Sequence, residues 1–299
     1  MNWLKYKKIY FTVSLIMIAV SIYSLFSWGL KLGVDFRGGT IIEYKLANEI
    51  STEEVMKAIE EKGLEVTSIQ QTSEDTYLIK LPPINTEEKT IIEGVLLNAS
   101  HAQEKTDVDE LRFETVGPTV GPELVKKTVY AILIAAGAIL LWVAYQFKSF
   151  KFGASAILAM FHDSFILIGA FSLLGHFLGA EIDFLFVTAL LTTLSFSVHD
   201  TIVVFDRIRE IKKKYGGEDI QVANTALTET MVRSLNNSFT IAFMLIALLL
   251  LGGTTVRWFA AAILIGTILG TYSSPFVAVP LLVSWSRATR RIMLISKKF

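Results

Sequence analysis

The segment Phe184–Lys214 reads FLFVTALLTTLSFSVHDTIVVFDRIREIKKK and combines the two features that decide the fold of this chain. It begins as an apolar run, and about 20 such residues are needed to cross a bilayer as a helix. Toward its end the run carries His199 and Asp200, and it then continues into a strongly basic stretch. An ionisable side chain at membrane depth costs at least about 2.5 kcal/mol, so it usually faces a protein interior or a wet cavity and marks an ion path. The segment therefore predicts a membrane helix with a functional carboxylate.

The composition is that of a polytopic membrane protein. Of the 299 residues, 52% are hydrophobic and only 19% are charged, and the mean hydropathy is +0.51. Soluble domains do not carry such an apolar excess. The chain has no cysteine, which excludes disulfides, thiolate metal sites and a cysteine nucleophile. The first apolar segment is too long for a signal-peptide core, so we expect a retained anchor.

Six apolar runs are near the length of a bilayer crossing, which predicts six transmembrane helices with both termini on one side. The fifth run is short unless the polar residues 234–238 also lie in the membrane. The runs are Ile9–Leu30, Val129–Phe147, Phe152–Leu174, Phe184–Phe205, Phe239–Leu251 and Trp258–Trp285.

The distribution of charge predicts the orientation and the division into domains. Residues 31–125 hold 9 basic and 19 acidic residues, whereas the amino end, the 148–151 turn, the 206–233 loop and the tail hold 16 of the 28 basic ones. By the positive-inside rule these basic segments are cytoplasmic. We therefore expect residues 1–30 to form the cytoplasmic N-terminus and first helix, and residues 31–125 an extracytoplasmic domain. The remainder, 126–299, would form five helices with a cytoplasmic 206–233 loop and C-terminal tail.

The extracytoplasmic domain has the pattern of an α+β fold. Ser51 and Glu54 form a capping box that starts a helix, and alternating apolar residues predict strands on either side of it. The resulting order, β-α-β-β-α-β, is the ferredoxin-like split pattern, which hosts many unrelated functions. The strands are predicted at Thr40–Leu46, Glu65–Gln71, Thr76–Leu81 and Glu110–Val116, and the helices run from Ser51 to Lys62 and over Thr86–Ala102.

The last apolar run carries small residues at intervals of four. Gly266, Gly270 and Ser274 share one face of a helix, and such spacing lets two helices pack closely in lipid. Packing is the favoured interpretation over contact with a substrate. Pro275 and Pro280 are expected to kink the helix just beyond this face.

Ionisable residues on three successive spans form the candidate site. His162 and Asp163 lie near the middle of the third span, and Arg233 stands at the start of the fifth, opposite Asp200 of the fourth. Such a set suits a proton relay, in which a carboxylate alternates between a charged, paired form and a neutral form. The alternative is that the two carboxylates only hold helices together, and Arg207 competes with Arg233 as the partner of Asp200. Polar residues that follow Arg233 complete the set: Ser234, Asn236, Asn237 and Ser238.

Neither a metal site nor an enzyme is expected. Adjacent residues point to different sides of a helix, so the two His-Asp pairs supply too few ligands for a tight transition-metal centre. The chain has no nucleophile elbow, phosphate loop, zinc-protease motif or dinucleotide fingerprint, and no cofactor or nucleic acid is implied. Gly38-Gly39 lacks a phosphate-loop lysine and predicts a turn, while Lys212–Lys214 mark topology and could contact anionic lipid.

Five motifs in order, over nearly the whole chain, resemble those of the SecD/SecF family of bacterial protein-export membrane proteins. The single small outer domain, of roughly 95 residues, is similar to the SecF branch, because SecD carries a much larger one. The motifs are Gly33-Val-Asp-Phe-Arg-Gly-Gly-Thr40, Val116-Gly-Pro-Thr-Val-Gly-Pro-Glu-Leu124, His162-Asp163, Asp200-Thr-Ile-Val-Val-Phe-Asp-Arg-Ile-Arg-Glu210 and Arg233-Ser-Leu.

The resemblance implies partners and a cellular role. It implies a pseudo-symmetric complex with SecD, similar to resistance-nodulation-division transporters, in the bacterial cytoplasmic membrane. That complex assists the SecYEG channel and the SecA ATPase and uses the proton motive force to pull unfolded preproteins outward. YajC and YidC are further candidate partners.

The resemblance also assigns residues. Asp200 and Arg233 match the proton-coupling carboxylate and its arginine, whereas Asp206 and Arg207 match positions with a structural or gating role. His199 stands where family members commonly have asparagine, so the motif leaves the choice between proton and sodium coupling open. The junction between the first span and the outer domain is matched by Asp35, Arg37, Gly38 and Gly39.

Two other functions fit the same sequence. The chain could be a structural scaffold for SecD or SecYEG that moves no ions, in which case the charge of Asp200 is dispensable for export. It could also be half of a small-molecule efflux transporter of related architecture, which sensitivity to drugs would reveal.

Overall fold

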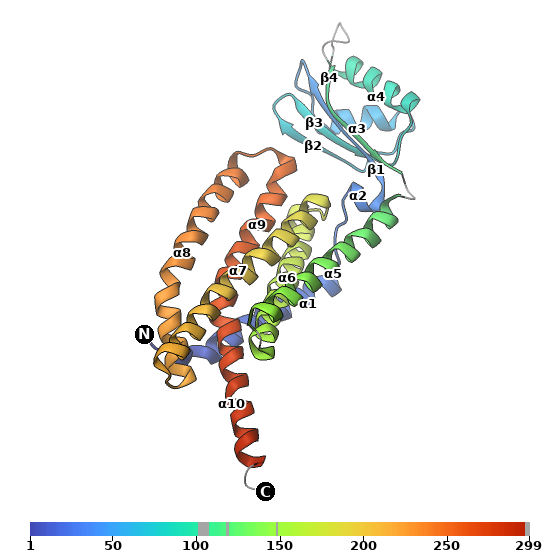
Figure 1. Ribbon diagram of the computed structural model, residues 1–299. Helices are drawn as coiled ribbons and strands as arrows, with labels where there is room; N and C mark the ends of the chain where they lie inside the picture. The colour runs from blue at the N-terminus through green and yellow to red at the C-terminus, as the bar shows by residue number, and fades with distance from the viewer. Residues whose placement is uncertain (101–107, 118–119, 148, 297–299) are drawn as a thin grey trace. The chain divides into compact units, whose positions relative to one another are not determined.

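The chain forms two compact units, each of which is described by itself. One unit comprises Leu32–Tyr130, and the other joins the residues up to Lys31 to those from Ala131 onward. We call them the α/β unit and the helical unit (Figure 1). The computed structural model describes residues 1–100, 108–117, 120–147 and 149–296.

The α/β unit has the predicted β-α-β-β-α-β order, preceded by one helical turn. Its elements are α2 (Val34–Arg37), β1 (Gly39–Leu46), α3 (Thr52–Glu60), β2 (Ser68–Ser73), β3 (Thr76–Leu81), α4 (Thr86–Ala99) and β4 (Val108–Val116). The sheet has the strand order β2-β3-β1-β4, and all neighbouring strands are antiparallel. This arrangement is compatible with the ferredoxin-like split. Helices α3 and α4 lie on one side of the sheet (Figure 1).

Alternate side chains of the inner strand β1 form the core of this unit. Ile42, Tyr44 and Leu46 of β1 are buried because every second side chain of a strand points to the same face. They pack with apolar side chains of β3, α3 and α4. The strand β2 begins at Ser68 rather than at the predicted Glu65, since its pairing with β3 starts there.

Both helices of the unit begin with a capping box. The hydroxyl of Ser51 accepts from the backbone N–H of Glu54, as predicted, and Asn85 and Glu88 form the same arrangement ahead of α4. Each box satisfies N–H groups that the first helical turn leaves free. Ala102, the predicted end of the second helix, lies outside the described residues.

The Gly38-Gly39 pair forms the predicted turn between α2 and β1. Their φ angles are 80° and 141°, in the range that favours glycine. A Cβ on Gly39 would also lie 2.8 Å from the carbonyl oxygen of Leu81 on β3. Glycine is therefore required at this position both by the backbone angle and by the close approach of β3.

Six helices of the described residues are long and apolar enough to cross a membrane, which confirms the predicted number. The first is α1 (Lys7–Ser27), which follows the single turn η1 (Trp3–Tyr6). The others are α5 (Val120–Phe147), α6 (Phe150–Leu178), α7 (Phe184–Tyr215), α8 (Asp219–Leu251) and the continuous stretch of α9 (Thr254–Ser273), η3 (Ser274–Ala278) and α10 (Val279–Ser296).

The prediction of a loop at 206–233 is wrong. Helix α7 continues to Tyr215, α8 begins at Asp219, and only a short turn with Gly216 and Gly217 at positive φ separates them. The stretch is strongly charged, but Lys, Arg and Glu are good helix formers, so both helices extend beyond their apolar parts. The polar residues 234–238 consequently lie inside α8, and the fifth span is not short.

Small residues bring α7 and α9 close together, as the spacing predicts. A Cβ on Gly266 would overlap Thr193 of α7, and one on Gly270 would lie 3.2 Å from the Cα of Ser197. Ser274 extends the contact by a hydrogen bond of its hydroxyl to α7. Helix α7, which carries Asp200, therefore approaches α9 almost backbone to backbone.

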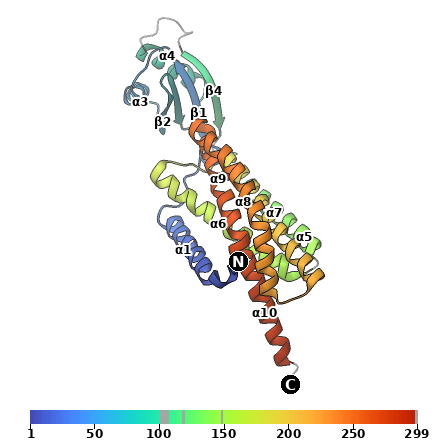
Figure 2. The same ribbon diagram turned by 90° about the vertical axis from the view of Figure 1, so that its left-hand side faces the viewer.

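Helix α1 packs against α6 through a second set of small residues. Gly169 of α6 leaves room for Ser21, where any Cβ would overlap the serine side chain. Ser14, Ser21 and Ser24 are the buried residues of α1, and Figure 2 shows α1 beside α6.

The helix of the last span changes from α-helical to π-helical winding at Pro275, where the sequence predicted a kink. Residues Ser274–Ala278, which include Pro275, form a π-helical turn, and Pro280 lies in the first turn of α10. Proline removes a backbone donor and so disturbs the regular hydrogen-bond ladder. Such π-helical turns are frequent at functional sites.

Candidate ion-coupling site in the membrane helices

Asp200 lies beside a small cavity between α7, α8 and α9. The cavity measures about 20 Å³, which is room for about one water molecule. Six of its nine lining residues have polar side chains, so a water there would find several hydrogen-bond partners. The lining residues are Phe196, His199, Asp200, Asn237, Ser238, Ile241, Thr267, Gly270 and Thr271.

Each of the three helices contributes to this cavity. Asp200 comes from α7 and is half-buried, and no hydrogen bond or salt bridge engages its carboxylate within the described residues. Ser238 of α8 and Thr271 of α9 are joined by a hydrogen bond of 2.5 Å between their hydroxyls. The Asp200 carboxylate thus lines a cavity that also contains hydroxyl, amide and imidazole groups.

Arg233 lies one helical turn from this cavity. It precedes Asn237 by four residues on α8, which places both on the same side of the helix. Its side chain is exposed and interacts electrostatically with Asp200, although no salt bridge joins them. The structure therefore brings Asp200, His199 and Asn237 to one cavity and leaves the predicted arginine nearby.

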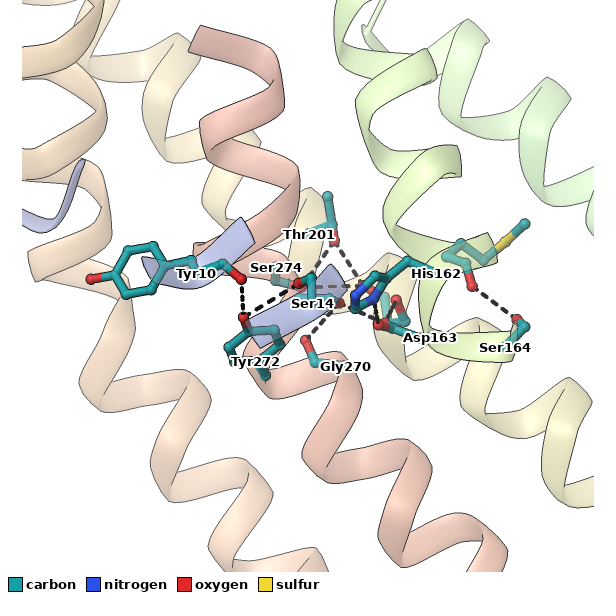
Figure 3. A network of polar contacts seen from close by, with 12 residues as sticks. Tyr10, Ser14, His162, Asp163, Ser164, Thr201, Gly270, Tyr272 and Ser274 are labelled. Atoms are coloured by element: carbon teal, nitrogen blue, oxygen red, sulfur yellow. Dashed lines mark hydrogen bonds and ion pairs between the residues drawn. The ribbon is translucent and has the colours of Figure 1, made fainter. Parts of the chain in front are cut away.

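Asp163 occupies a different environment, in the middle of α6. Its Oδ2 accepts hydrogen bonds from the hydroxyls of Ser197 on α7, at 2.6 Å, and Ser273 on α9, at 2.5 Å. Its Oδ1 lies 2.9 Å from Nδ1 of His162 (Figure 3). The carboxylate is buried and ties three helices together.

His162 connects this cluster to α1 and α9. Its ring stacks on that of Tyr272, with 6.5 Å between centroids. The Tyr272 hydroxyl donates to the carbonyl oxygen of Tyr10 at 2.8 Å and lies 3.3 Å from the hydroxyl of Ser14. A ring contact and the hydrogen bonds of Tyr272 therefore link the Asp163 cluster to the first helix (Figure 3).

The Asp206-Arg207 pair lies near the end of α7, where it joins helices instead of meeting Asp200. Arg207 binds Glu229 of α8 and Glu210 of its own helix, each at 2.5 Å. Asp206 lies 3.7 Å from Arg209. Arg207 is thus engaged elsewhere, which leaves Arg233 as the basic partner candidate for Asp200.

The predicted junction motif belongs to the α/β unit. Asp35 and Arg37 lie in α2, and Gly38 and Gly39 form the turn into β1. These four residues shape the start of the sheet.

Sequence reasoning missed the hydroxyl groups that hold Asp163. Thr193, Ser197 and Thr201 recur at intervals of four on α7, which places them on one helical face. That face meets the small-residue face of α9. The matching periods were visible in the sequence and could have identified Ser197, whereas Ser273 carried no comparable signal.

Among the described residues, no group of three or more histidine, aspartate or glutamate side chains could hold a metal ion. The two His-Asp pairs do not converge: one lines the cavity of Asp200, and the other is bound to serines.

The fold and the site define a class: a polytopic membrane protein with six spans, an α/β unit after the first and ionisable residues within the bundle. Residues 97–288 match the family model described as protein export membrane protein SecD/SecF, C-terminal, and residues 23–49 match the SecD/SecF GG motif. The chain therefore belongs to the SecD/SecF family.

Full-length relatives carry the name protein translocase subunit SecF. The one from Thermobaculum terrenum is 40% identical over 298 residues, with 94% of this chain and 92% of the relative covered. The one from Vibrio alginolyticus is 37% identical, covering 93% of this chain and 87% of that relative.

A solved structure extends the comparison to three dimensions. The crystal structure of SecDF, a translocon-associated membrane protein from Thermus thermophilus, matches with a TM-score of 0.82 and 34% identity. The match covers 96% of this chain but only 39% of the SecDF chain. This chain thus corresponds to a part of that longer protein.

Proposed function

We propose that this chain is the SecF-type subunit of the Sec protein-translocation machinery. It acts with SecD, alongside the SecYEG channel and SecA, to complete preprotein export across the bacterial cytoplasmic membrane. Support comes from the SecF relatives that match over nearly their whole length and from the SecDF chain in which a matching part occurs. Both termini are cytoplasmic in this proposal, and the α/β unit faces outward, in agreement with the charge distribution.

The proton motive force drives this activity through Asp200. The observation that carries the proposal is a half-buried carboxylate with no hydrogen bond among the described residues, facing a cavity of water size. One water there would connect Asp200 to the polar wall and allow a proton to arrive and leave. Carboxylates in the membrane that are already fully hydrogen-bonded have less freedom to change charge.

Arg233 supplies the positive charge that attracts Asp200 when its carboxylate is ionised. In the ionised state the carboxylate attracts the guanidinium across one helical turn, and protonation removes that attraction. The change in this attraction acts on α7, α8 and α9, because these three helices meet at the cavity. These helices would then shift relative to one another and transmit motion to the preprotein.

Inverted membrane vesicles test the assignment. We expect Asp200→Asn to abolish the part of preprotein translocation that the proton gradient stimulates, while the ATP-driven part persists and SecD still co-purifies. Asp109→Asn makes the same chemical change on an exposed strand residue and should leave the stimulation intact.

The scaffold function predicts the opposite result. If Asp200→Asn retained full gradient stimulation at matched protein levels, the carboxylate would be structural and ion coupling would be excluded from this residue. Loss of SecD from the purified complex would instead indicate an assembly defect, so co-purification is scored in the same samples.

A further inference from the structure

A second ionisable cluster, the His162–Asp163 dyad, lies within the helical unit. Nδ1 of His162 and Oδ1 of Asp163 are 2.9 Å apart, and each side chain is 7% exposed. The dyad and the Asp200 cavity share no lining residue. The proposed function uses Asp200 and Arg233 and assigns no chemistry to this pair.

The hydrogen bonds of the dyad are those expected for an ionised Asp163. Asp163 receives two hydroxyl donors on Oδ2 and the histidine on Oδ1, which matches an ionised carboxylate because that group only accepts. With Asp163 ionised, Nδ1 of His162 carries the ring proton and donates to Oδ1. Asp163 fixes the tautomer of the ring, as carboxylates beside histidines commonly do.

The remaining ring nitrogen is the reactive atom. Nε2 of His162 is buried and has no hydrogen-bond partner among the described residues. A buried acceptor left unpaired is destabilising, and an uncompensated carboxylate inside the membrane is more so. A proton on Nε2 relieves the second penalty, because it makes the His162–Asp163 pair neutral overall.

We infer that the His162–Asp163 dyad is a proton-binding site separate from Asp200. The proton, delivered by a hydrated donor, adds to the lone pair of Nε2 and converts the imidazole to an imidazolium. The carboxylate of Asp163 remains ionised as its counter-ion and keeps both serine hydrogen bonds. The O–H bond of the donor breaks as the N–H bond forms, and no bond within the dyad breaks.

Few other titratable groups face the dyad from the helices packed against it. Helix α9 presents Tyr272 and α1 presents Tyr10, whereas η3 carries no titratable residue. Helix α7 presents His199 and Asp200, which line the separate cavity. The negative charge of Asp163 must therefore be compensated by His162.

The site is positioned to influence the Asp200 cavity. Ser197, which donates to Asp163, lies against Gly270 of α9, and Gly270 lines the cavity of Asp200. Ser273, the other donor, is the last residue of α9 before the π-helical turn. This link to export rests on the proposed function, whereas proton binding by the dyad does not.

Solid-state NMR of ¹⁵N-histidine protein in lipid vesicles tests the inference directly. The full chain has four histidines, and the His162 signals are those that His162→Gln removes. We expect a proton to appear on Nε2 as the pH is lowered from about 9 to about 5, and Asp163→Asn to move the midpoint at least about one pH unit lower. His176→Gln, at the end of the same helix, should leave these signals unchanged.

Either of two results would overturn the inference: an Nε2 that stays unprotonated at about pH 5, or a midpoint that Asp163→Asn does not move. The wild-type titration alone decides the first, even if the variant folds poorly. Repeating it in Asp200→Asn separates the two proposals, because the His162 titration should persist there whether or not export depends on Asp200.

Discussion

Two carboxylates within the same bundle have opposite surroundings. Asp163 is buried and bound by two serines and a histidine, whereas Asp200 is half-buried beside a cavity and has no hydrogen bond within the described residues. Hydrogen bonds to a carboxylate stabilise its charged form. This difference supports the proposal that Asp200, rather than Asp163, changes its charge during coupling.

At Gly39, the replacement Gly39→Ala should destabilise the α/β unit by about 1–3 kcal/mol, the usual cost of forcing a side chain into a strained backbone region. The added Cβ would also press on the carbonyl oxygen of Leu81, 2.8 Å away. Faster hydrogen exchange of β1 and β3 amides in the full-length protein would measure the effect.

Gly94→Ala is the matched control. Gly94 lies inside α4, and a methyl group at this position would have no neighbour within 4 Å, so alanine should be neutral or stabilising by up to about 1 kcal/mol. Equal exchange rates in both variants would show that the turn tolerates a side chain.

The sequence predicted the ionisable residues of the site but not their partners. Asp200, Arg233 and His199 stood out because charge is rare in an apolar run. Ser197 could be recognised only by its spacing on α7, and Ser273 had no such signal, because a serine binds Asp163 only when three helices have the right orientation about their axes. That orientation follows from packing between helices and is absent from any single segment.

At the scale of helices and strands, lengths and small-residue faces were predictable. The spacing of Gly266 and Gly270 predicted that α9 packs closely against another helix, since small residues permit close approach in lipid, but it did not identify α7 as that helix. The 206–233 loop was predicted wrongly because charge marks the membrane boundary and does not mark the end of a helix. The π-helical turn at Ser274–Ala278 was not anticipated beyond a kink at Pro275.

The α7–α9 contact can be tested by adding a single methyl group. Gly266→Ala should separate the two helices and cost about 1–3 kcal/mol, the usual effect of overpacking, because its Cβ would overlap Thr193. Thermal unfolding in detergent should show a lowered midpoint. Gly137→Ala on α5, where a Cβ has no neighbour within 4 Å, should leave the midpoint unchanged.

At the scale of the whole molecule, the order of elements was largely encoded in local pattern. The six spans and the β-α-β-β-α-β order follow from apolar length and alternation. In the most apolar 18 residues of α5 and of α8 only 6% are buried, so this part of each helix is largely available to lipid or to SecD. Whether lipid or SecD covers each of these helices depends on the partner chain, so it could not be predicted from the sequence of this chain.

The central claim is that Asp200 carries protons. Proton flux into vesicles loaded with a pH-sensitive dye tests it most directly, with this chain and SecD reconstituted together and a pH gradient imposed. The account predicts flux in the wild type, its loss in Asp200→Asn and its retention in Asp109→Asn. Equal flux in the wild type and Asp200→Asn would contradict it.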